Sequence, residues 1–150
     1  MSDEAAAHLM FPTLVMTSKI VALTSEQMAQ IEKLSVQEVR DKTMKVFSAK
    51  SGEVVIIDRV LGKHEFITYA MGIDKENKVK QIEILEYKET YGHEIKRAEW
   101  RKQFYGKDKM AKLKRTDDIQ NVSGATLSCK HVTDGVRQVL VSYDLIKTSI

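Results

Sequence analysis

Hydroxyl side chains gather at one point of the chain where their types and spacing allow chemistry. Residues 123–128 read S-G-A-T-L-S, and an amphipathic segment with valines at helical spacing follows them. The first turn of a helix presents free backbone N–H groups and the positive end of the helix dipole, which together favour phosphate. Thr126 would then hold its hydroxyl within reach of that phosphate, and a phosphoester on this residue is chemically possible. A threonine without an adjacent base is a poor nucleophile, so the bond would require a helper enzyme.

The same residues also have a purely structural interpretation. Ser123 or Thr126 can cap a helix by accepting hydrogen bonds from its first N–H groups. Gly124 permits a backbone turn that other residues disfavour. The local pattern does not choose between a helix cap and a phosphate site.

Three other side chains offer alternatives. Cys129 could be a redox thiol, but its place early in a helix favours a small buried side chain. His93 and His131 could take part in proton uptake, although a surface position is the simpler interpretation of each. With one cysteine and scattered histidines, the chain has neither an internal disulfide nor a recognisable metal-ligand spacing.

Helices are predicted in three places. An apolar stripe predicts the last helix over about residues 126–145; it consists of Val132, Val136, Val139, Leu140 and Tyr143. Thr24 and Gln27 form a capping-box pattern that starts an earlier helix, which Val36 and Val39 extend. A short helix carries the buried or rim aromatics Trp100, Phe104 and Tyr105.

Strands are predicted between these helices. Segments rich in β-branched or alternating apolar residues begin near residue 44 and continue at 54–57, 66–73 and 79–87. Short turns at 50–52, 61–64 and 74–77 separate them, which indicates an antiparallel meander. The expected fold class is α+β: a single domain with an antiparallel sheet and helices packed on one face and at the ends. Residues 1–23 are expected to form an irregular N-terminal arm before a domain at 24–150.

Composition narrows the class of protein. The 150 residues suit one domain, and 43% hydrophobic with 30% charged residues is typical of a soluble globular protein. The net charge of +3 is modest, and the basic run at 107–115 lacks the interleaved aromatics of a nucleic-acid groove, so no nucleic acid is expected. No apolar run approaches the length of a membrane span. The acidic opening, M-S-D-E, differs from an intact secretory signal.

Four segments together resemble one family. S-G-A-T-L-S before a valine-rich helix resembles the S-G-A-T flavinylation signature of FMN-binding domains, which occur in peripheral subunits of the Na⁺-translocating NADH:quinone reductase and of Rnf complexes. Residues 72–79 (G-I-D-K-E-N-K-V) resemble the family's G-I-D-x-D-G-K-I hairpin. Residues 83–92 (E-I-L-E-Y-K-E-T-Y-G) resemble its V-x-V-L-x-H-x-E-T-P-G stretch, and residues 100–107 (W-R-K-Q-F-Y-G-K) its W-x-x-Q-F-x-G-K. They follow the family's order over roughly residues 45–140.

The resemblance implies a flavoprotein electron carrier, more an electron-transfer protein than a stand-alone enzyme. Its FMN would be joined by a phosphoester to Thr126 by a separate flavin transferase, with FAD as donor and Mg²⁺ required. Ser128 would donate a hydrogen bond near the phosphate, and the E-T-Y-G loop would approach the isoalloxazine ring. The implied cofactor-binding residues are Thr126, Ser123, Gly124, Ala125, Leu127, Ser128, Glu89, Thr90, Tyr91 and Gly92.

The chain departs from the family pattern at two points. Gln120 stands where the family usually has Asp, six residues before the attachment threonine, and Asp118 is the nearest acid that could substitute. The loop E-T-Y-G-H-E lacks the family's proline and second glycine. Tyr91 either stacks on the flavin ring or fills the loop.

The resemblance also implies partners and a location. The partners would be the flavin transferase and a redox protein or membrane electron-transport complex. The location would be extracytoplasmic, in the periplasm or at the outer face of the cytoplasmic membrane after removal of an export segment, where a tether prevents loss of FMN. Two alternatives are a sensor or assembly module that binds FMN reversibly, and a structural domain in which S-G-A-T is only a cap.

Overall fold

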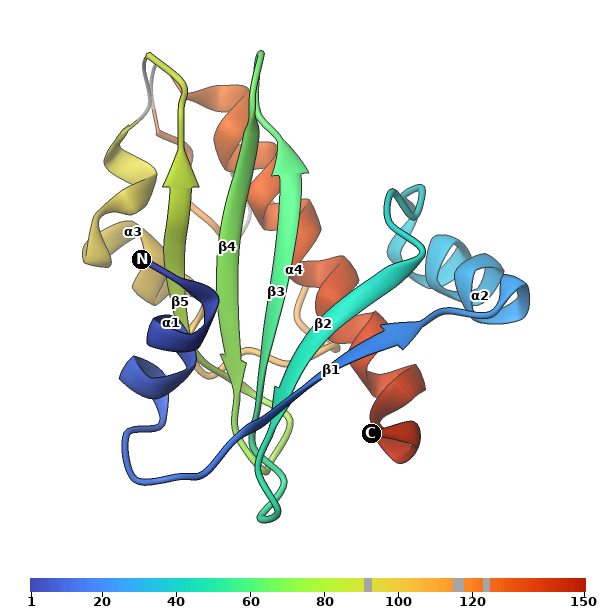
Figure 1. Ribbon diagram of the computed structural model, residues 1–150. Coiled ribbons are helices and arrows are strands. Elements are labelled where there is room, and N and C mark those ends of the chain that lie inside the picture. Colours follow the sequence, from blue (N-terminus) through green and yellow to red (C-terminus); the bar gives the residue numbers. More distant parts are fainter. Residues whose placement is uncertain (91–92, 115–117, 123–124) are drawn as a thin grey trace.

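Five strands form one open antiparallel sheet in the computed structural model, which describes residues 1–90, 93–114, 118–122 and 125–150 (Figure 1). The strand order follows the sequence, β1-β2-β3-β4-β5. The strands are β1 (Thr17–Ala22), β2 (Thr43–Ser48), β3 (Val54–Leu61), β4 (Phe66–Ile73) and β5 (Val79–Tyr87). The meander and the α+β class predicted from the sequence are confirmed.

The longest helix, α4 (Thr126–Ile146), crosses one face of the sheet (Figure 1). Helix α2 (Ser25–Ser35) packs against α4, and α3 (Ala98–Arg101) lies beside β5 at the sheet edge. Short 3₁₀ turns η1 (His93–Lys96) and η2 (Lys102–Phe104) flank α3, and η3 (Lys147–Ser149) follows α4. The main core lies between α4 and the sheet, and the whole predicted stripe is buried there: Val132, Val136, Val139, Leu140 and Tyr143.

Helix α1 (Asp3–Met10) lies on the opposite face of the sheet, against β3, β4 and β5. Ala6, Ala7 and Met10 face a second apolar cluster that includes Phe47 and Val55. The sequence predicted helices on one face and at the ends, which describes α2, α3 and α4; α1 adds cover to the other face.

Residues 1–23 are therefore structured, and the expectation of an irregular arm is corrected. Ser2 caps α1 by accepting the N–H of Ala5 at 3.0 Å, and β1 pairs with β2 from Thr17 opposite Ser48. Alanines gave α1 a weak helical pattern, and β1 escaped notice because every residue except Val21 is exposed, so apolar alternation is absent. The division of the chain at residue 24 stays a prediction.

The remaining element boundaries agree closely with the sequence. The capping box of Thr24 and Gln27 is confirmed by reciprocal hydrogen bonds of 3.0 and 2.9 Å. Helix α2 ends at Ser35 rather than extending to Val39, because Val36 adopts a left-handed conformation with φ 57°. In the described part of the chain, helices are too short or too polar to cross a membrane.

Candidate functional site

Helix α4 begins at Thr126, inside the S-G-A-T motif. Ala125 occupies the N-cap position. The N–H of Cys129 donates the first helical hydrogen bond to the carbonyl oxygen of Ala125, at 2.9 Å. No side chain of the described residues caps this helix. The N–H groups of Thr126, Leu127 and Ser128 therefore point out of the helix end, where the dipole favours an anion.

Side chains at this helix end differ sharply in exposure. Thr126 and Leu127 are exposed, whereas Ala125 and Ser128 are buried. The thiol of Cys129 is fully buried and accepts the N–H of Val122 at 3.2 Å, which supports the structural interpretation of this cysteine. Thr126 thus presents an exposed side chain at a helix N-terminus that no described side chain caps.

Strand β5 ends beside this first helical turn. The hydroxyls of Tyr87 and Ser128 lie 3.4 Å apart, and the Tyr87 ring meets His93 edge to face with centroids 5.0 Å apart. Burial raises the pKa of the Tyr87 phenol, and the contact with Ser128 opposes that shift. The predicted E-T-Y-G loop consequently leaves the sheet next to the start of α4.

Glu89 binds the turn between β3 and β4. Its Oε1 accepts the backbone N–H groups of His64 and Glu65, the latter at 2.8 Å, and these bonds lower the pKa of the carboxyl. Gly62 makes the approach possible, because a Cβ there would lie 2.8 Å from the same oxygen. In this structure Glu89 anchors the loop to a neighbouring turn. Thr90, the next residue, is exposed.

The segment before S-G-A-T is held through the backbone of Gln120. The indole Nε1 of Trp100 donates to the Gln120 carbonyl oxygen at 2.8 Å, and the Gln120 N–H donates to Oε1 of Gln103 at 2.7 Å. The nearby acid, Asp118, accepts the N–H groups of Leu113 and Lys114 at 2.9 and 2.8 Å. Burial disfavours the Asp118 carboxylate, but these bonds outweigh it and lower its pKa.

A hollow of about 460 Å³ lies beside this segment. Its lining residues come from the region of η1 to η2 and from residues 120–122; they are Glu94, Arg97, Glu99, Trp100, Gln103, Gln120, Asn121 and Val122. Oδ1 of Asn121 is buried and has no hydrogen-bond partner within the described chain. An acceptor of this kind suits a ligand that brings its own N–H or O–H donor.

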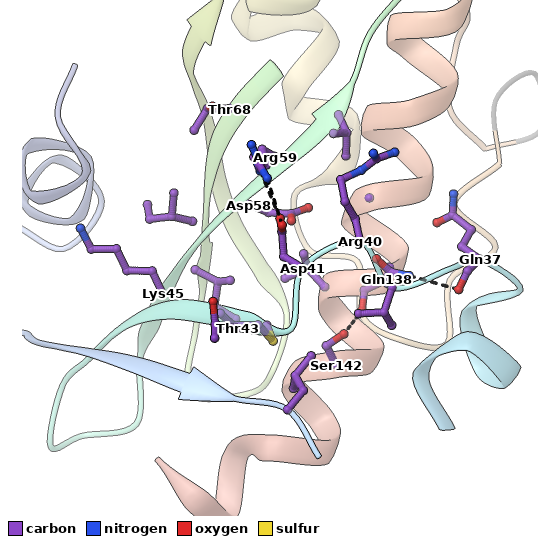
Figure 2. A pocket seen from close by; sticks show the side chains of 18 of the residues that line it. Gln37, Arg40, Asp41, Thr43, Lys45, Asp58, Arg59, Thr68, Gln138 and Ser142 are labelled. Atoms are coloured by element: carbon purple, nitrogen blue, oxygen red, sulfur yellow. Dashed lines mark hydrogen bonds and ion pairs between the residues drawn. The ribbon is translucent and has the colours of Figure 1, made fainter. Parts of the chain in front are cut away.

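A larger cavity, of about 600 Å³, lies between α4, β3 and the segment of residues 37–43 (Figure 2). Lys130 and His131, roughly one helical turn beyond Thr126, line it. Figure 2 shows Arg59 and Asp41 joined at its wall. Nη2 of Arg59 lies 3.1 Å from Oδ1 of Asp41. Its volume is that of a typical small-molecule site.

Asp58 lines this larger cavity over the buried Tyr69, whose hydroxyl donates to its Oδ2 at 2.6 Å. Burial raises the pKa of Asp58 to about 6, although the bond from Tyr69 opposes the shift. Gly135 of α4 faces the pair; a Cβ there would lie 2.8 Å from the Tyr69 hydroxyl and 2.6 Å from Val60. Neither Asp58 nor Tyr69 was predicted from the sequence as a site residue. A glycine inside a helical stripe was the available signal, because such residues mark close approach of another element.

Comparison with known families decides which ligand the chain binds. The family model described as "FMN-binding domain" matches residues 62–141, more than half of the chain. The chain belongs to the FMN-binding domain family. A search of curated proteins finds no match to it. The match includes both ends of the β3–β4 turn, β4, β5, the W-R-K-Q-F segment and most of α4, so the resemblance seen in the sequence is confirmed.

The geometry of this FMN-binding domain fits the cofactor's phosphate. The helix end is free of a side-chain cap within the described residues, its flanking Ala125 is small, and the Thr126 hydroxyl is accessible. Of the predicted site residues, the structure brings Ser128 next to Tyr87 at the head of the E-T-Y-G loop. Ser123, Gly124, Tyr91 and Gly92 lie outside the described residues. Their predicted contacts with FMN, and those of Glu89 and Thr90, stay predictions.

Proposed function

We propose that this FMN-binding flavoprotein carries electrons on an FMN joined covalently to Thr126. The observation that carries the proposal is the placement of Thr126: an exposed hydroxyl in the first turn of a 21-residue helix that lacks a side-chain cap in the described chain. A phosphate esterified there would meet the N–H groups of the first helical turn and the positive end of the dipole. The buried Oδ1 of Asn121 is a further candidate contact for the cofactor.

The attachment is a phosphoryl transfer that a separate flavin transferase catalyses. The hydroxyl oxygen of Thr126 attacks the phosphorus of the FMN half of FAD and forms the phosphoester. The anhydride bond between the two phosphates of FAD breaks, and AMP leaves with the bonding electrons. The hydroxyl proton would pass to a base on the transferase, because no hydrogen bond joins the Thr126 hydroxyl to a base among the described residues. Mg²⁺ held by the transferase would offset the phosphate charges.

Bound FMN supplies one- and two-electron redox chemistry, and the protein supplies its position and surroundings. The N–H groups of the first α4 turn would hold the phosphate, and Ser128, which lies beside Tyr87, would keep a hydroxyl close to it. Glu89 secures the E-T-Y-G loop to the β3–β4 turn, at the same end of the sheet. The redox partner would be another protein or a membrane complex, and the location extracytoplasmic, where a tether prevents loss of the flavin.

A denaturing gel imaged for flavin fluorescence tests the proposal. The protein is produced with and without a flavin transferase and run beside its Thr126→Val variant. We expect a fluorescent band only for the wild type with transferase. Yellow protein that loses all flavin on denaturation would instead support reversible binding. Colourless protein in the presence of transferase would show that S-G-A-T is only the start of a helix.

A further inference from the structure

We infer that Trp100 and Gln103 are positioning residues for the attachment of FMN to Thr126. The inference rests on the proposed function and concerns the segment that leads into S-G-A-T. Both backbone polar groups of Gln120, six residues before Thr126, are bound by these two side chains, at 2.8 and 2.7 Å. The two side chains and Gln120 are called the Gln120 clamp below.

The clamp has a fixed orientation. Nε2 of Gln103 donates to the carbonyl oxygen of Trp100 at 3.0 Å, which turns Oε1 of the same amide toward the N–H of Gln120. A flipped amide would place its NH₂ group against that N–H and its oxygen against the carbonyl, so both bonds would be lost. Only one orientation of the Gln103 amide therefore allows both hydrogen bonds.

The clamp is rooted in the core. Trp100 is 5% exposed and packs edge to face on the fully buried Phe104, with ring centroids 5.2 Å apart. Ile119, next to Gln120, is also buried. The indole N–H thus reaches Gln120 from a rigid base, and an aromatic packing partner resists its rotation.

Val122, between Gln120 and the S-G-A-T motif, is bound to α4 itself. The N–H of Val122 donates to Sγ of Cys129 at 3.2 Å, and the N–H of Ala125 donates to the carbonyl oxygen of Val122 at 3.0 Å. The described residues on both sides of positions 123 and 124 are consequently tied to rigid elements. Of these ties, the clamp is the one made by side chains of the W-R-K-Q-F segment.

The Gln103 bonds fix the position of Gln120 more than they stabilise the folded protein. The bond between Gln103 and the exposed Gln120 lies at the surface, so water can replace it at little cost in folding free energy. A transferase, however, must bring the Thr126 hydroxyl in line with a phosphorus atom, and a displacement of about 1 Å costs such reactions about 100-fold in rate. Loss of the Gln103 bonds should therefore lower the flavinylation rate while leaving the melting temperature nearly unchanged.

The test measures initial flavinylation rates of purified apo-protein with limiting transferase, FAD and Mg²⁺, over a range of protein concentrations. Gln103→Met keeps the length of the side chain and removes both the oxygen and the NH₂ group of its amide. We expect kcat/KM to fall about 10- to 100-fold. Gln103→Glu keeps an oxygen acceptor for Gln120 and should recover part of the rate. Trp100→Phe keeps an aromatic ring beside Phe104 but lacks the N–H and part of the buried indole, so it should also be slow and should melt at a lower temperature. Melting temperatures are measured for every variant.

Gln81→Met is the matched control, since Gln81 bonds to Glu83 on strand β5 and is absent from the clamp. It should react at the wild-type rate. If Gln103→Met and Trp100→Phe also do so, the inference is overturned; equal losses in Gln81→Met overturn it as well. Should Gln103→Met fail to fold, Gln103→Glu and Trp100→Phe decide on the same criterion. Failure of the proposed function looks different, because the wild type itself would then acquire no adduct on Thr126.

Discussion

The hydroxyl oxygen of Tyr87, the last residue of β5, lies 3.4 Å from that of Ser128 in the first turn of α4. This contact joins the exit of the sheet to the helix end that carries Thr126. E-T-Y-G begins two residues after Tyr87 and S-G-A-T ends two residues before Ser128, so the contact links two motifs whose first residues are 34 positions apart in the sequence. Such a meeting point is what a cofactor needs if one motif holds its phosphate and the other approaches its ring.

Replacing Glu89 with alanine should loosen the E-T-Y-G loop. The N–H groups of His64 and Glu65 would lose a charged acceptor, which we expect to cost about 1–2 kcal/mol in the free energy of unfolding. Because the pKa of Glu89 is lowered in the folded protein, its stabilisation is present above the ordinary value of 4.5 and is lost as pH falls through the lowered value. Urea titrations of wild type and Glu89→Ala should therefore differ at pH 7 and converge as the pH falls below 4.5. A constant difference across this range would contradict the assignment.

Asp58 should give stability the opposite dependence on pH. Its pKa is raised from 3.8 to about 6, so the folded protein holds a proton that the unfolded chain releases earlier. This contribution is full below pH 3.8 and is lost as pH rises through about 6. Asp58→Asn keeps an oxygen acceptor for Tyr69 and removes the titration. Its stability relative to wild type should rise between pH 4 and pH 7, by at most about 3 kcal/mol. A difference independent of pH would show that Asp58 ionises normally.

Gly135→Ala should destabilise the protein, against the usual trend for helices. Alanine in a helix interior is ordinarily favoured over glycine by about 1 kcal/mol. At this position the new Cβ would lie 2.6 Å from Val60 and 2.8 Å from the Tyr69 hydroxyl, so α4 must shift away from β3. Overpacking of this kind costs about 1–3 kcal/mol, which thermal or urea unfolding would detect. A rise in melting temperature would contradict the close approach.

Local sequence patterns predicted the elements that their own residues define. Strands β4 and β5 and the first residue of α4 agree with prediction, because apolar alternation or helical spacing begins and ends there at turn residues. Strand β1 was missed because its partner β2, rather than an apolar face, holds it in the sheet. The position of Thr126 at an accessible helix end was likewise predictable from the residues around it.

Contacts between residues far apart in the chain could not be predicted from local sequence patterns. Asp58 meets Tyr69 because they are paired across β3 and β4, and that register depends on the turn between the strands. Glu89 reaches the β3–β4 turn across 24 residues, and Trp100 reaches Gln120 across 20. The W-x-x-Q spacing could be read as a motif, but its task of holding a backbone segment becomes visible only once the chain is folded.

Peptide mapping by mass spectrometry gives the most direct test of covalent FMN on Thr126. Wild type, Thr126→Ser and Thr126→Val are each produced with a flavin transferase and digested. We predict a mass increase of about 440 Da on the wild-type peptide that contains Thr126. Thr126→Ser, which retains a hydroxyl, should carry the adduct at a lower yield, and Thr126→Val, which keeps the shape without the hydroxyl, should carry none. An undiminished adduct on Thr126→Val, or a wild-type adduct on another residue, would contradict the assignment.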